Sequence, residues 1–259
     1  MGSTLHEGYR GFKVPRMDAW LPDSSGRPAP LEIDVRTASP PAQLPPCPWT
    51  FPDPRLAEDH GLIGEGADFA PATVIAAYRQ GIFPWPHGET EYLWFSPTPR
   101  AIIPLDGLHI SRRLARTVRS GKFHVSIDGA FEDVILACAE CRDDGTWITP
   151  ALMDGYCDLH RLGWAHSVEV WNQQDELVGG LYGIGIGAMF GAESMFSRER
   201  DASKVAMVAL LQHARTIGIQ LIDVQVLTDH TERMGAVEIS RDEYLDRLKS
   251  AVESRVAWT

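Results

Sequence analysis

The stretch LVGGLYGIGIGAMFGAESMFSR, residues 177–198, decides the fold class. Its glycines follow a GxGxG pattern, which suggests a phosphate-binding loop, but such a loop lies between a strand and a helix. Here Gly183, Gly185 and Gly187 alternate with larger residues, and this period of two is typical of a strand. Glycines on one face of a strand let another element or a ligand approach closely. The stretch therefore predicts a tightly packed strand and disfavours a nucleotide-binding loop.

The segments around this strand predict an α+β fold. The expected elements are helices at 130–142 and 151–163, strands at 165–171 and 176–190, a helix at 202–218 and a strand at 219–227. This order favours a mainly antiparallel mixed sheet over a doubly wound parallel sheet.

The N-terminal half has a different character. Residues 1–48 are rich in Pro, Ser and Gly, so we expect an extended or partly disordered appendage. From Trp49 on, a small unit of helix and loop is expected, with one helix that follows Pro71 and ends at Gly81. A second short helix should have Ser111 as its N-cap, and the strand-like run 123–128 comes after it.

Length, composition and charge limit the function classes. The chain has 259 residues and 44% apolar residues, enough for one large domain or for a small domain beside a larger one. It has no apolar run of membrane-spanning length and no apolar N-terminal signal, so we expect a cytoplasmic protein without a membrane span. The net charge of −11 disfavours broad, nonspecific binding of nucleic acid but leaves room for a local basic patch.

One such patch is a cluster of arginines on the short helix after Ser111. Spacings of three and four place most of these side chains on one helical face, where they either contact a phosphate backbone or form a solvated surface. Its members are Arg112, Arg113, Arg116 and Arg119.

The cysteines suggest a structural metal as one alternative. Cys138, Cys141, Cys157 and His160 have the spacing of a zinc site with three cysteines and one histidine. The other reading places both pairs on amphipathic helices, where Cys behaves as a small buried apolar residue. The spacing leaves both readings open.

Two carboxylates lie within apolar runs. Glu193 occurs in FGAESMF and Asp223 in LIDVQVL, and a carboxylate in such surroundings needs a partner or a task. Gln225 follows two residues after Asp223, so a regular strand would place both side chains on one face. The pair is either a candidate catalytic unit or a buried hydrogen-bonding pair.

With these motifs taken together, the chain resembles the leucyl/phenylalanyl-tRNA–protein transferases of bacteria. The resemblance runs from about residue 51 to residue 248 and includes AYRQGIFPW, LWFSPTPRAI, GTWIT, the opening stretch and LIDVQVL, all in one order. It implies transfer of leucine or phenylalanine, with methionine left open, from aminoacyl-tRNA to proteins that begin with Arg or Lys, which marks them for N-end rule degradation. It also implies a small N-terminal domain at 49–98, a GNAT-like acyltransferase domain at 99–259, and no cofactor.

The resemblance assigns roles to particular residues. Trp85 and Trp147 match the tryptophans that hold the 3′-terminal adenosine of the tRNA, and the arginine cluster matches a basic patch for the acceptor stem. Aromatic faces suit this task because unpaired bases stack on them.

For the chemistry, Asp223 and Gln225 match the family's catalytic pair, and Val224 stands where the family has Cys. In the expected reaction Asp223 polarises Gln225, which accepts or relays the proton of the attacking amine; in a weaker version the pair only positions the amine. Glu193 is expected to face the basic N-terminal residue of the acceptor. The aminoacyl pocket is expected to be lined by Leu181, Phe190, Leu210, Ala214 and Ile222.

Two other functions stay open. An acyl-CoA-dependent GNAT-like N-acyltransferase would need a pyrophosphate loop before a helix, and the opening stretch lacks that context. A tRNA-binding or degron-binding module without activity would not need Asp223, Gln225 and Glu193.

Overall fold

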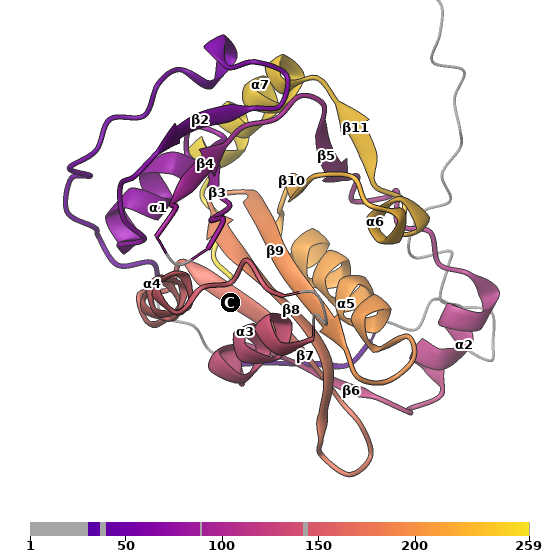
Figure 1. Ribbon diagram of the computed structural model, residues 1–259. Coiled ribbons are helices and arrows are strands. Elements are labelled where there is room, and N and C mark those ends of the chain that lie inside the picture. The colour runs from indigo at the N-terminus through magenta and orange to yellow at the C-terminus, as the bar shows by residue number, and fades with distance from the viewer. Residues whose placement is uncertain (1–30, 37–39, 89, 142–144, 259) are drawn as a thin grey trace, which may run out of the picture.

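The computed structural model describes residues 31–36, 40–88, 90–141 and 145–258 (Figure 1). Its elements, in chain order, are β1 Ile33–Val35, η2 Pro54–Leu56, β2 Leu62–Glu65, α1 Pro71–Tyr78, β3 Phe83–Pro84, β4 Leu93–Phe95, β5 Arg100–Ile103, α2 Arg112–Arg119, β6 His124–Ile127, α3 Phe131–Glu140, α4 Pro150–Arg161, β7 Ala165–Trp171, β8 Leu177–Ile186, β9 Met189–Ser197, α5 Ala202–Ile217, β10 Leu221–Gln225, α6 Asp229–Arg233, β11 Val237–Ile239 and α7 Arg241–Glu253.

A large mixed sheet forms the centre of the molecule. Its strand order is β1-β6-β7-β8-β9-β10-β5-β11, in which β1 with β6 and β9 with β10 are parallel and the other neighbours are antiparallel. A small antiparallel sheet, β2-β4-β3, lies beside α1. The predicted α+β class is confirmed: the large sheet is mixed and mainly antiparallel, and the small sheet with α1 forms an N-terminal unit.

The opening stretch forms two strands, so the single strand predicted over 176–190 is wrong. Strand β8 ends at Ile186, and β9 returns antiparallel from Met189. Gly187 lies at the turn with φ +57°, a left-handed backbone conformation that favours glycine. A hydrophobic run cannot by itself reveal a two-residue reversal, and this is why the hairpin was missed.

The other glycines of β8 let helices and rings approach the sheet. A Cβ on Gly179 would lie 2.5 Å from Ala202 of α5, whereas one on Gly180 would lie 3.3 Å from Val134 of α3. Successive strand residues face opposite sides, so α5 and α3 cover opposite faces of the sheet. A Cβ on Gly185 would lie 2.1 Å from the indole of Trp258. The predicted close packing on this strand is confirmed.

Part of the predicted N-terminal appendage belongs to the large sheet. Strand β1 pairs in parallel with β6, and the indole nitrogen of Trp164 donates to the carbonyl of Ala42 over 2.9 Å. Residues 40–48 form no helix or strand, and residues 1–30 and 37–39 of that predicted appendage lie outside the described residues. Residues 31–36, LEIDVR, alternate apolar and charged side chains, which is a strand signal, but the prediction followed the proline-rich composition of the surrounding segment.

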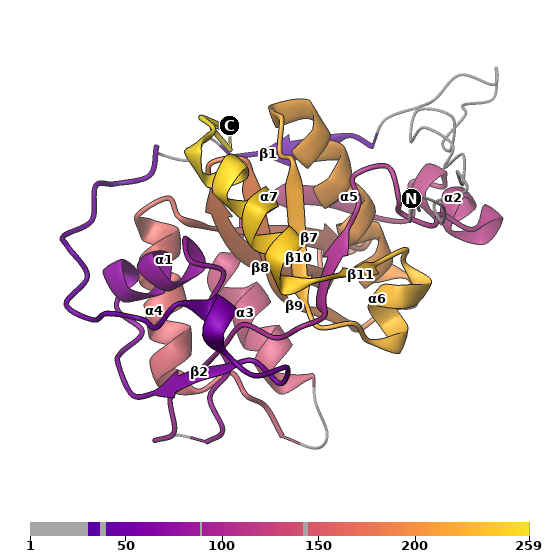
Figure 2. The same ribbon diagram turned by 90° about the horizontal axis from the view of Figure 1, so that it is seen from above.

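Both predicted short helices occur. Helix α1 begins at Pro71, and Ser111 caps α2 by accepting a hydrogen bond from the Leu114 backbone N–H over 3.2 Å. Figures 1 and 2 show α1 and the small sheet at one end of the molecule and α2 at the other.

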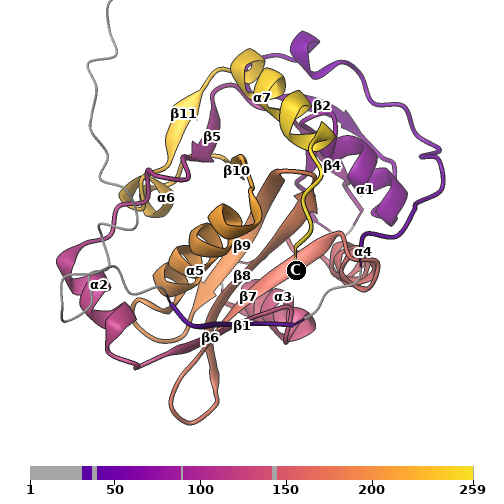
Figure 3. The same cartoon turned by 180° about the vertical axis from the view of Figure 1, so that it is seen from behind.

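The C-terminal part of the chain completes both the sheet edge and the core. Helix α7 follows the edge strand β11 and packs beside β9 and β10. Figure 3 shows the chain then returning toward β8, where Trp258 packs in the core next to Phe190 with 4.8 Å between ring centroids.

Candidate active site

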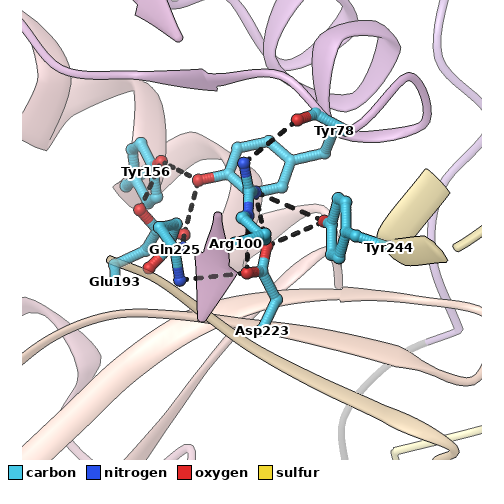
Figure 4. A network of polar contacts seen from close by, with 8 residues as sticks. Tyr78, Arg100, Tyr156, Glu193, Asp223, Gln225 and Tyr244 are labelled. Atoms are coloured by element: carbon cyan, nitrogen blue, oxygen red, sulfur yellow. Dashed lines mark hydrogen bonds and ion pairs between the residues drawn. The ribbon is translucent and has the colours of Figure 1, made fainter. Parts of the chain in front are cut away.

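A buried ion pair lies where β5 meets β10. The Arg100 guanidinium donates to both carboxylate oxygens of Asp223 over 2.9 and 2.6 Å, and the Tyr244 hydroxyl donates to Asp223 over 2.8 Å (Figure 4). The side chains of Arg100 and Asp223 are only 1% and 0% exposed. Burial opposes the charge on Arg100, but the adjacent carboxylate outweighs it and raises the pKa of the guanidinium. The partner that Asp223 needed is therefore Arg100.

Strand β10 ends in a bulge that places Gln225. The pairing with β5 shifts register between Asp223 and Gln225, and Gln225 has φ +58°, so the regular strand assumed for this pair is wrong. The backbone N–H of Gln225 donates to Asp223 over 3.0 Å, while its side-chain amide nitrogen donates to Glu193 over 3.3 Å. Asp223 thus holds the backbone of Gln225, and the amide side chain turns to the second carboxylate.

Glu193, on β9, is held by two phenols. The hydroxyl of Tyr78, from α1, donates to Oε1 over 2.5 Å, and that of Tyr156, from α4, donates to Oε2 over 3.2 Å (Figure 4). Burial raises the pKa of Glu193 to about 8, although both hydrogen bonds favour the ionised form. Three segments far apart in the sequence therefore set the charge of one side chain.

Two cavities meet at Glu193. The first, which we call the tryptophan pocket, has a volume of about 170 Å³ and is lined by Phe83, Pro84, Trp85, Trp147, Glu193, Val224, Gln225, Val226 and Thr228. The second, which we call the hydroxyl pocket, has a volume of about 410 Å³ and is lined by Cys141, Ala192, Glu193, Ser194, Met195, Phe196, Ser197, Ser203, Val224, Val226, Thr228, His230 and Thr231. Four predicted site residues, Trp85, Trp147, Glu193 and Gln225, thus line one pocket.

The other predicted site residues lie elsewhere. The five assigned to an aminoacyl pocket, Leu181, Phe190, Leu210, Ala214 and Ile222, are buried in one core cluster, and none of them lines either pocket. The arginine cluster lies on the exposed side of α2, where Arg113 also pairs with Asp201 over 2.9 Å.

The side-chain arrangement does not support the zinc alternative. Within the described residues, no group of three or more His, Cys, Asp or Glu side chains is arranged to hold a metal ion. His160 instead contacts the Ala165 carbonyl over 2.8 Å and stacks on Phe131. In the same part of the chain, no helix has both the length and the apolar character of a membrane crossing.

Sequence reasoning missed four residues of the network: Tyr78, Arg100, Tyr156 and Tyr244. Arg100 carried a weak signal, because a charged residue that opens the apolar run AII needs a partner if the run is buried. The tyrosines fitted the apolar face of their helices and gave no sign that their hydroxyls meet a carboxylate.

A buried polar network that borders an aromatic pocket and a larger cavity suits an enzyme active site. A family model described as "Leucyl/phenylalanyl-tRNA protein transferase" matches residues 102–249, and the N-terminal domain model of the same family matches residues 67–98. The chain belongs to the leucyl/phenylalanyl-tRNA protein transferase family, as its resemblance predicted.

Individual relatives agree with this membership. The leucyl/phenylalanyl-tRNA–protein transferase of Anaeromyxobacter sp. (strain K) is 51% identical over 78% of this chain and 88% of its own length. The Proteus mirabilis enzyme of the same name is 49% identical over 81% of this chain and 92% of its own. Among solved structures, L-PGS from Bacillus licheniformis aligns with a TM-score of 0.38 and 13% identity over 67% of each chain, a likeness too weak to carry an argument.

Proposed function

We propose that the protein transfers leucine or phenylalanine from aminoacyl-tRNA to the N-terminal α-amine of proteins that begin with Arg or Lys. The observation that carries this proposal is the tryptophan pocket, where Trp85 and Trp147 share one cavity with Glu193 and Gln225. Two aromatic faces beside a carboxylate and an amide suit a nucleobase whose attached ester must meet an amine.

The tRNA end would occupy the tryptophan pocket. Stacking on Trp85 and Trp147 would hold the 3′-terminal adenosine, and each stacked ring contributes about 1–3 kcal/mol in comparable sites. The arginine cluster on α2 would meet the phosphates of the acceptor stem, because its side chains are exposed on an otherwise acidic protein.

The aminoacyl side chain would enter through the hydroxyl pocket. Ala192 and Val224 line this pocket and belong to the core cluster that contains the five predicted aminoacyl residues. Trp258 packs against Phe190 in that cluster. Discrimination between Leu, Phe and Met would then depend on methylene-scale packing, worth about 1–3 kcal/mol.

For the chemistry, Gln225 would orient the amine and Asp223 would fix Gln225. The contact of Asp223 with the backbone N–H of Gln225 favours the weaker form of the expected mechanism, in which the pair positions the amine. Substitution of Gln225 by Ala should lower turnover sharply and leave tRNA affinity nearly unchanged.

The acceptor preference would come from Glu193. Among the described residues that line the two pockets, it is the only carboxylate, so it would attract a cationic N-terminus.

The proposal also includes N-end rule degradation of the products, a cytoplasmic location, and a division of the chain at 1–48, 49–98 and 99–259. Strand β5 supports the boundary between 98 and 99, because it enters the large sheet at Arg100, whereas β1, from residues 1–48, pairs with β6 in that same sheet.

One assay tests the transfer and its alternatives. An Arg-initiated peptide is incubated with leucyl-tRNA or with acetyl-CoA, and the added mass is measured. We expect addition of leucine from tRNA only. Addition of acetyl would instead support the acyl-CoA-dependent enzyme, and no addition would support a binding module. A peptide that begins with Ala serves as the matched acceptor control.

A further inference from the structure

The two carboxylates of the site differ in their access to the two pockets. Asp223 is fully buried and accepts hydrogen bonds from Arg100, Tyr244 and the Gln225 backbone, and it lines neither pocket. Glu193 lines both pockets, and among the described residues its hydrogen bonds come from two phenols and an amide. A substrate that occupies both pockets therefore meets Glu193 and does not meet Asp223.

Gln225 is a poor candidate for the base itself. A side-chain amide is neutral, and its oxygen binds a proton far more weakly than a carboxylate does. Its amide nitrogen already donates to Oε1 of Glu193 over 3.3 Å, so the two side chains are held in contact. This contact lets Gln225 orient the carboxylate and the incoming nitrogen together.

We propose that Glu193 is the catalytic base that accepts the proton of the attacking α-ammonium, and that Tyr78 and Tyr156 are positioning residues that hold its carboxylate. The inference rests on the proposed function and deepens it, because it assigns the proton to a residue that was expected only to recognise the basic acceptor. A cationic N-terminus beside Glu193 favours its ionised form, so the same carboxylate first binds the ammonium and then removes its proton.

Glu193 takes one proton from the α-ammonium, and the freed lone pair attacks the ester carbonyl carbon. The C–N bond forms, the bond from carbon to the ribose oxygen breaks, and the second proton of the amine moves to that oxygen. The products are an amide, the free ribose hydroxyl of the tRNA and a protonated Glu193, which returns its proton to water.

The surroundings of Glu193 suit this transfer. The charged and titratable groups that face it are Tyr78 from α1, Tyr156 from α4, Asp223 from β10 and Arg100 from β5, with His230 and Cys141 across the hydroxyl pocket. Burial raises the pKa of Glu193 to about 8, close to the value of roughly 7.7–8.0 for a free α-amine. Proton transfer between groups of matched pKa works best near the operating pH.

The rival base is His230. Within the described residues its Nε2 has no hydrogen-bond partner, and it lines the hydroxyl pocket. Burial lowers its pKa, so its neutral form is the stable one. His230 does not line the tryptophan pocket, however, whereas Glu193 borders both cavities.

The test compares wild type, E193Q, Y156F and H230Q in single-turnover transfer from leucyl-tRNA between pH 6 and 9. We expect wild type to show an ascending limb near pH 8 and E193Q to lower the rate at pH 7 by about 10²–10⁴-fold. The E193Q defect should shrink toward pH 9, because water has by then deprotonated the α-amine without help from a base. Y156F removes a hydrogen bond that favours the ionised carboxylate, so it should move that limb to higher pH. Thermal melting checks that each variant is folded.

A second acceptor separates the base from a recognition role. A peptide whose α-nitrogen is part of an aminooxy group is already neutral at pH 7, so it needs no base, and the E193Q defect should shrink to less than tenfold. An equal defect with both acceptors, or an E193Q defect that stays constant from pH 7 to pH 9 while that of H230Q shrinks, would overturn the proposal. If wild type transfers nothing from leucyl-tRNA, the proposed function fails instead, so the two failures are distinguishable.

Discussion

The Arg100 side and the Glu193 side of the site bury a carboxylate in different ways. On the Arg100 side, Asp223 has a bidentate cation and a phenol and is closed to both pockets. On the Glu193 side, the carboxylate has phenols and an amide and borders both pockets. A buried carboxylate that a cation neutralises, such as Asp223, stabilises the fold. A buried carboxylate that only neutral donors hold, such as Glu193, can exchange a proton.

The largest effect is expected when the ion pair between Arg100 and Asp223 is broken. R100M leaves Asp223 buried without its cation, so the free energy of unfolding should fall by about 3–5 kcal/mol. Urea unfolding measures this change. R113M is the matched control, because its ion pair with Asp201 has an arginine that is 45% exposed and should contribute no more than about 1 kcal/mol. Equal losses in both variants would show that the Arg100 side is not a special structural pair.

The next effect tests the charge state on the Glu193 side. A glutamate titrates near 4.5 when unfolded and near 8 here, so between these values the folded wild type keeps a proton that the unfolded chain has lost. Wild-type stability should therefore fall as pH rises through this window, by up to about 1.4 kcal/mol per pH unit.

E193Q removes this titration, so its stability relative to wild type should rise steadily from pH 5 to pH 8 in urea unfolding. E199Q is the control, because Glu199 is a surface carboxylate that bonds Lys122. Parallel pH curves for wild type and E193Q would mean that Glu193 is ionised throughout.

A smaller effect is expected in the tryptophan pocket, which Glu193 borders. W85A and W147A should each weaken binding of aminoacyl-tRNA by about 1–3 kcal/mol, because each removes one stacking face. Equilibrium binding measures the loss. W49A is the matched control, since Trp49 is an exposed tryptophan outside both pockets. A loss of the same size in W49A would point to a general aromatic effect instead of a base site.

The smallest effect probes the surface distant from both carboxylates. R112A and R116A should each reduce the salt dependence of tRNA binding by about one unit of slope, because each removes one phosphate contact. R215A, an exposed arginine near the end of α5, should leave the slope unchanged. If the salt dependence of tRNA binding is unchanged in all three variants, α2 is a solvated surface that does not contact tRNA.

Sequence reasoning anticipated the site best where local pattern carries the signal. Asp223 and Glu193 stood out as carboxylates in apolar strands, and the resemblance added Trp85 and Trp147, which share a pocket with Glu193. It did not anticipate Tyr78, Tyr156 and Arg100, because hydrogen bonds between residues 115, 37 and 123 positions apart leave no periodic trace.

The sequence alone determined the α+β class, the family and the residue types of the site, because periodicity and ordered motifs are local properties of the chain. Only the tertiary structure decided that the opening stretch folds back as a hairpin, that a bulge turns Gln225 toward Glu193, and which carboxylate is neutralised. These features depend on burial and on partners from distant segments, and a side chain's charge is set by what surrounds it in space.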